Sequence, residues 1–195
     1  MKIFDLYDAK DIKIEDPGLR RYICLSEKLM IKSHGREMER FGKAKVNLIE
    51  RLINFIGVPG HRGKKHKIMT SWASGKWTKN ASLVLKAFKI VEEKTKQNPI
   101  QVFVKAVENA APRDEITTIE YGGARYPQAV DVSPMRRISL ALKNIVHGAY
   151  DKSFNKKTAM ADALASELIA ASENSGEAFC IAKKNETEKM ADSAR

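Results

Sequence analysis

The chain has 195 residues, 43% of them hydrophobic, which is enough for one domain with a real core and too few to require two. Its 35 Lys and Arg against 24 Asp and Glu give a formal net charge of +11, so the surface should attract polyanions such as nucleic acid. No stretch approaches the roughly 18 consecutive apolar residues of a membrane span. The start carries Asp5, Asp8 and Asp11 where a signal peptide needs a basic flank, so we predict a cytoplasmic protein with no membrane partner.

The first 44 residues show no sustained period, and we predict that residues 1–44 form an N-terminal extension, an extended basic arm. We expect this arm to become ordered only on RNA. A helical domain over residues 45–195 should follow. Its first helix begins near Lys45, because Val46, Ile49 and Ile53 recur at helical spacing, and Gly57 ends it.

Residues 57–78 form an irregular, strongly basic segment. Residues 61–80 hold 6 basic residues and no acidic one, and both tryptophans, Trp72 and Trp77, lie there between lysines. Lysines neutralise phosphates, and indole rings can stack on unpaired bases. We therefore predict a basic RNA-binding loop. The alternative is a solvated loop whose tryptophans anchor it to its own core.

Two further helices are predicted, from about Asn80 and from Pro99, before the period changes. Residues 114–133 are rich in Ile, Thr, Tyr and Val and are split by Gly122-Gly123, which indicates a β-hairpin with a tight turn. Pro127 restricts its strand to an edge. Because an isolated two-stranded ribbon is only marginally stable in water, we expect this one to lean on a partner.

Three more helices complete the prediction: one opened by Ser133 as N-cap with Pro134 at its first position, one over residues 157–173, and a short charged one from about Lys183. The predicted fold class is mainly α. We expect a bundle of about six helices with the β-ribbon inserted between the third and fourth helices.

Arg136 and Arg137 lie in the first turn of the fourth helix, where the macrodipole disfavours cations by about 0.3–1 kcal/mol each. A phosphate docked there would compensate, since it would also satisfy free N–H groups of the helix start. The alternative is two solvent-facing arginines. Arg125, just past the glycines, could reach nucleic acid, whereas Tyr121 and Tyr126 could serve cross-strand packing instead.

The sequence matches none of the enzyme or cofactor-binding motifs that we compared with it. A phosphate loop would need Gly where Val58 stands and Ser or Thr where Lys65 stands. The four histidines share no metal-ligand spacing, and Cys24 and Cys180 belong to no CxxC, so we expect no metal, no cofactor, no disulfide and no catalysis. A helix-turn-helix regulator of DNA is a weaker alternative, because the third helix carries only Lys105 as a cation before its end.

The run NPIQVFVKAVENAAPRDEITTIEYGGARYPQAVDVSPMRRISLALKNIVHGAY, with its ENAAPR, YGG and SPxRR elements, closely resembles the universal family of small-subunit ribosomal protein number seven. Upstream, RRYICLSEKLMIKSHGREMERFGKAKVNLIERLINFI looks like the archaeal form, and the resemblance covers nearly the whole chain. It implies a helical fold with a β-ribbon. It also implies a primary binder of the 3′ major domain of small-subunit rRNA that nucleates head assembly, at the subunit interface near the decoding centre.

The resemblance further implies neighbours: other head proteins, small-subunit protein number eleven, mRNA and exit-site tRNA, with no homo-oligomer. The residues expected to face exit-site tRNA and mRNA are those of the ribbon tip: Tyr121, Gly122, Gly123, Arg125 and Tyr126. The residues expected to bind rRNA are cations and the two tryptophans: Arg36, Arg40, Lys43, Lys45, Arg62, Lys64, Lys65, Lys67, Trp72, Lys76, Trp77, Lys79, Arg113, Arg136, Arg137, Lys143, Lys156 and Lys157.

Overall fold

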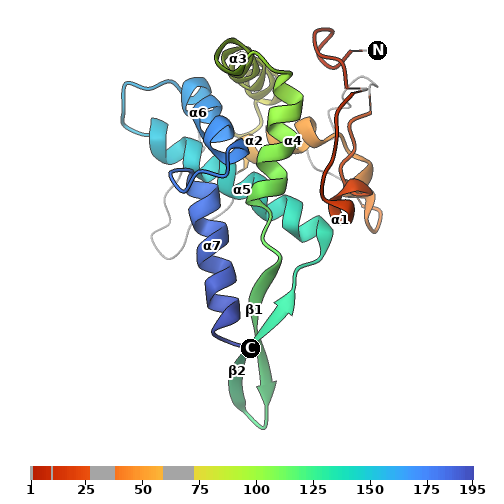
Figure 1. Cartoon of the computed structure of the whole chain (residues 1–195), viewed down its shortest axis with the longest axis vertical. Coiled ribbons are helices and arrows are strands. Elements are labelled where there is room, and N and C mark those ends of the chain that lie inside the picture. Colours follow the sequence, from red (N-terminus) through yellow and green to blue (C-terminus); the bar gives the residue numbers. More distant parts are fainter. Residues whose placement is uncertain (1, 10, 27–37, 59–72) are drawn as a thin grey trace.

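A computed structural model describes residues 2–9, 11–26, 38–58 and 73–195. Helices pack around one core, and a two-stranded ribbon projects from one end (Figure 1). The elements of the described residues are α1 Pro17–Arg20, a 3₁₀ turn Gly42–Lys45, α2 Leu48–Gly57, α3 Trp77–Thr95, α4 Pro99–Ala110, β1 Asp114–Tyr121, β2 Ala124–Asp131, α5 Pro134–Ser153, α6 Met160–Ser172 and α7 Phe179–Asp192. The prediction of a mainly helical fold with a hairpin between the third and fourth long helices is confirmed.

The core forms where α6 packs against α3, α4 and α5. Its largest fully buried side chains include Phe88 and Phe103, whose ring centroids lie 5.8 Å apart. Each helix buries the apolar stripe that its sequence spacing predicts, for example Ile138 and Leu142 on α5. The hydrophobic effect therefore holds one continuous core together.

Side chains cap the starts of three of the described helices, α1, α2 and α4. Asn47 and Asn98 cap α2 and α4, because each side-chain oxygen accepts a hydrogen bond from the N–H two residues further on. Ser133 stands at the N-cap position of α5 and Pro134 follows it, as predicted. The Ser133 side chain, however, makes no capping hydrogen bond. α7 begins four residues before the predicted Lys183, since Cys180 and Ile181 are buried.

The ribbon is an antiparallel hairpin with a two-residue turn. Gly122 and Gly123 have φ of +60° and +80°, which is the type I′ geometry that only glycine adopts without strain at both positions. Because hydrogen-bonded and non-bonded pairs alternate from this turn, Pro127 and its partner Thr118 form a non-bonded pair. The missing N–H of Pro127 thus costs no hydrogen bond within the ribbon.

The base of the ribbon leans on α7 of the same chain, and contact of the ribbon with a partner stays a prediction. The N–H of Arg113 donates to Glu188 Oε1 on α7 at 2.9 Å, and the N–H of Ala129 donates to the carbonyl of Ala194 at 3.4 Å. Arg195 Nη2 lies 2.6 Å from Asp114 Oδ2. Only the tip beyond these contacts projects freely from the described residues (Figure 1).

The described part of the N-terminal extension, residues 2–9 and 11–26, packs against the helical domain, and its ordering on RNA stays a prediction. Leu19 is fully buried, and Ile3, Tyr7 and Ile23 also join the core. Residues 1–26 hold five basic and five acidic residues, so the positive excess of the extension comes from residues 27–44, with five basic and three acidic residues. We call residues 8, 9 and 11–16 the strap, because they run along α4 (Figure 1).

Polar side chains of α4 hold the backbone of the strap. Asn98 donates to the carbonyl of Asp8, and Gln101 both accepts from the N–H of Lys13 at 2.9 Å and donates to its carbonyl at 3.0 Å. Glu108 Oε1 accepts from the N–H of Asp16. Each hydrogen bond joins residues about 90 positions apart, which no local sequence pattern reveals.

Candidate nucleic-acid interface

The two arginines at the start of α5 have different surroundings. Arg136 Nε lies 2.6 Å from Glu115 Oε1, and its side chain is 57% exposed. The Arg137 side chain is only 12% exposed, and its Nη2 lies 2.8 Å from Asp16 Oδ2. Carboxylates of the protein itself therefore offset the unfavourable position of both cations near the positive helix end.

Arg137 joins three parts of the chain. Its guanidinium donates to Asp16 at the end of the strap and, through Nε, to the carbonyl of Pro112 at 3.2 Å. Burial alone would raise the pKa of Asp16, but the hydrogen bonds from Arg137 and from the N–H of Gly18 outweigh it and lower that pKa below its ordinary value. Arg137 is thus occupied by the fold, whereas Arg136 keeps an exposed side chain.

Arg136, Ser139 and Lys143 follow one another along one face of α5, at spacings of three and four residues. Seven residues of helix place the two cations about 10 Å apart along the axis. We call these three residues the α5 stripe. It can run beside a nucleic-acid backbone, because the guanidinium and ammonium groups donate to phosphate oxygens, whereas the Ser139 hydroxyl between them donates to the carbonyl of Met135 at 2.9 Å.

Arg51 of α2 lies beside the α5 stripe and was absent from the sequence prediction. Its Nη2 donates to Ser139 Oγ at 3.2 Å, although only 5% of the residue is exposed. Burial lowers the pKa of Arg51 to about 10. The apolar spacing of α2 indicates Ile49 and Ile53 as core residues and gives no local signal that α5 covers Arg51.

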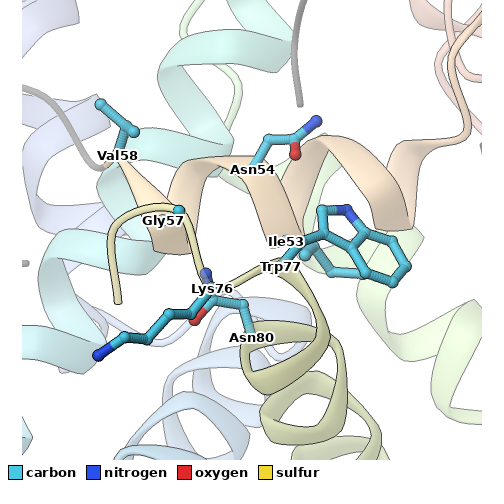
Figure 2. A pocket seen from close by; sticks show the side chains of 8 residues that line it. Ile53, Asn54, Gly57, Val58, Lys76, Trp77 and Asn80 are labelled. Atoms are coloured by element: carbon cyan, nitrogen blue, oxygen red, sulfur yellow. The ribbon is translucent and has the colours of Figure 1, made fainter. Parts of the chain in front are cut away.

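A pocket of about 380 Å³ lies where α2 ends and α3 begins, and two predicted RNA contacts line it (Figure 2). The side chains of Lys76 and Trp77 point away from each other across it (Figure 2). Lys76 is exposed, whereas Trp77 is half-buried against the core. Trp77 therefore anchors the start of α3, as the structural alternative expected, and Lys76 and Lys79 face solvent.

The ribbon has two chemically distinct faces. Ile119 and Tyr126 are directly opposite each other, and Tyr121 shares their face because alternate residues point to the same side. These three side chains are 44%, 58% and 81% exposed, and we call them the aromatic face. Arg125 lies on the other face, 3.5 Å from Glu120, so its charge does not join the tyrosines.

The other predicted RNA-binding residues are spread over the surface. Lys156 and Lys157 are exposed between α5 and α6, at the far end of α5 from Arg136, roughly 30 Å away along a 20-residue helix. Arg40 lies 5.3 Å from the Phe41 ring, and Lys45 pairs with Glu39 at 3.0 Å. Lys43 and Arg113 are exposed. The remaining predicted positions lie outside the described residues: Arg36, Arg62, Lys64, Lys65, Lys67 and Trp72.

Among residues 2–9, 11–26, 38–58 and 73–195, no group of three or more His, Cys, Asp or Glu side chains could hold a metal ion. Within the same ranges, every helix is too short or too polar to cross a bilayer. The charged groups that lie near one another are instead cations: Arg136 and Lys143 on α5 and Arg113 at the base of the ribbon.

Comparison with known proteins is consistent with these features. A family model described as Ribosomal protein S7p/S5e matches residues 19–195. The protein named Small ribosomal subunit protein uS7 of Nanoarchaeum equitans is 50% identical, over 100% of this chain and 99% of the relative. Proteins of the same name in Archaeoglobus fulgidus and Methanosphaera stadtmanae are 43% and 44% identical, each over 99% of this chain and over 94% and 98% of the relative.

Proposed function

The chain belongs to the ribosomal protein S7p/S5e family and is a structural, non-enzymatic component of the small ribosomal subunit, and we propose that it is a primary rRNA-binding protein. Its ligand is the 3′ major domain of small-subunit rRNA, and its binding nucleates assembly of the subunit head. In the subunit it lies at the interface near the decoding centre. Other head proteins and small-subunit protein number eleven are its protein neighbours.

The α5 stripe is the observation that carries this proposal at the level of residues. It places the exposed cation Arg136 and the half-buried cation Lys143 along one helix face, next to the ribbon base where Arg113 is exposed. A net charge of +11 adds long-range attraction for a polyanion. Phosphate contacts of this kind fix the register of a protein on RNA without reading its sequence.

The aromatic face of the ribbon supports a separate contact. Ile119, Tyr121 and Tyr126 expose apolar surface that nothing in the described residues covers, and aromatic rings stack on unpaired bases. We assign this face to the exit-site tRNA or mRNA that lies near the ribbon. Arg125, on the opposite face beside Glu120, then contributes little to stacking.

The test is equilibrium binding of the full chain to a transcript of the 3′ major domain, with random double-stranded DNA as competitor. If about 6–10 phosphates are contacted, affinity should fall by roughly 10³–10⁵ between 50 and 200 mM salt. Arg136→Ala should weaken binding, whereas Lys89→Ala, which removes an exposed charge elsewhere on α3, serves as the matched control. Equal affinity for random DNA and the transcript at moderate salt would refute the proposal.

A second measurement separates the ribbon from the body. Tyr121→Ala with Tyr126→Ala should leave binding of the transcript unchanged, because neither residue belongs to the α5 stripe. The same double variant, assembled into subunits, should retain less exit-site tRNA. A loss of transcript binding would instead mean that the aromatic face contacts rRNA.

A further inference from the structure

Arg51 is a buried cation that has no counter-charge among the residues that the structure describes. It is 5% exposed, and its only hydrogen bond to a described side chain is the one to Ser139, whose hydroxyl is neutral. Its Nη1 has no hydrogen-bond partner, and no carboxylate of the described residues forms an ion pair with it. Its neighbour Glu50 is also buried, but adjacent residues of a helix do not face each other.

Burying an uncompensated charge is among the most costly arrangements in a folded protein. Arginine at this position is not explained by packing alone, because an apolar side chain of similar volume would fill the same space without that cost. The buried charges elsewhere in the described residues have partners: Glu167 lies 2.7 Å from Lys152, and Arg137 lies 2.8 Å from Asp16. Arg51 differs from these two residues, because no described side chain of opposite charge pairs with it.

The surroundings of Arg51 indicate what is missing. Ser139, the acceptor of its hydrogen bond, is only half-buried and stands in the middle of the α5 stripe, between Arg136 and Lys143. A polyanion that follows the α5 stripe would bring negative charge to the hydroxyl that Arg51 contacts. In the low dielectric of a partly closed seam, that charge acts strongly on the guanidinium.

We propose that Arg51 is an anchor for the RNA backbone: a phosphate bound over Ser139 at the α2–α5 seam supplies the counter-charge that no described residue gives Arg51. This inference rests on the proposed function and names a phosphate site for it. The free chain bears an electrostatic cost that RNA binding removes, so the same residue lowers the stability of the free protein and raises the affinity of the complex.

The test is Arg51→Met in the full chain, because methionine keeps much of the length of the side chain and removes its charge. Without RNA, the melting temperature of the variant should rise by a few degrees. With the 3′ major domain transcript, its affinity should fall by about tenfold or more. The slope of log affinity against log salt should become shallower by about 0.7–0.9, the value expected for one lost phosphate contact.

Two further variants keep the interpretation clear. Lys89→Met removes an exposed charge from α3 and should change neither the melting temperature nor the salt slope. Arg51→Lys keeps the charge but not the planar fork of donors, so it should retain the wild-type slope with intermediate affinity. That result would show that the positive charge at position 51, rather than the size of the side chain, contributes to RNA binding.

Two results would overturn the inference. A lower melting temperature for Arg51→Met would mean that the fold itself compensates the charge. A salt slope equal to that of Lys89→Met would mean that no phosphate is lost with Arg51. If the wild-type chain fails to bind the transcript, the proposed function fails and the inference falls with it, whereas a wild type that binds while Arg51→Met keeps its slope removes only this site.

Discussion

Gly148→Ala should destabilise this protein, although alanine is the better helix former. Gly148 lies in α5, and a Cβ added there would stand 2.6 Å from Glu167 Oε1 and 2.9 Å from the Cβ of Phe179. Glu167 cannot easily yield, because it is fully buried, accepts from the N–H of Cys180 at 3.0 Å and pairs with Lys152. The extra methyl group therefore meets an occupied position where α5, α6 and α7 join.

The magnitude follows from three opposing effects. Alanine gains about 1 kcal/mol of helix propensity over glycine. Overpacking costs about 1–3 kcal/mol, and weakening the hydrogen bonds of a buried carboxylate costs about 1.5–3 kcal/mol. The net loss is about 1.5–5 kcal/mol, which for a chain of this length lowers the melting temperature by roughly 3–20 °C.

Thermal and urea unfolding of the full chain without RNA measure this loss. Gly176→Ala is the matched control, because a Cβ there would meet nothing within 4 Å and should change stability by less than about 0.5 kcal/mol. In a Glu167→Ala background, Gly148→Ala should cost less, since the obstructing carboxylate is gone. A Gly148→Ala variant as stable as wild type would refute this account of the junction.

Three further outcomes are expected. Arg137→Ala should lower stability by about 1–3 kcal/mol in thermal melts, because its buried partners lose a charged donor, whereas Arg136→Ala should stay within about 1 kcal/mol. The depressed pKa of Asp16 contributes stability that is present above its unfolded pKa of about 3.9 and is lost as pH falls through the lower folded value, so melts of wild type and Asp16→Asn should converge at acid pH. A stability difference that stays constant down to pH 2 would contradict this. Glu188→Ala should speed amide exchange across residues 114–131, since the N–H of Arg113 loses its acceptor on α7.

The elements that could be predicted from the sequence are those whose signals are local. The apolar spacing of α5, the Asn98-Pro99 start of α4 and the Gly122-Gly123 turn each depend on a few neighbouring residues. Helical period, capping and turn conformation act over at most about two helical turns. The prediction of a ribbon between two helices was therefore possible without any tertiary information.

The features that the sequence did not reveal share a different cause, which is dependence on contacts between distant positions. The strap looked like a free arm because Asn98, Gln101 and Glu108, which hold it, are ordinary polar residues of an amphipathic helix. Arg137 looked like a phosphate ligand because its partner Asp16 lies 121 positions away. Long-range pairing decides which charges are occupied by the fold, and no local pattern encodes it.

The strap also constrains the order in which this protein can fold during its own synthesis. Its anchoring side chains on α4 are made about 90 residues later, which at roughly 5–20 residues per second corresponds to about 5–20 s. Throughout that interval Leu19 and Ile23 have no completed core to enter. The N-terminal segment is thus among the first parts to be translated and among the last to be fixed, and during that delay its apolar residues are open to chaperones and proteases.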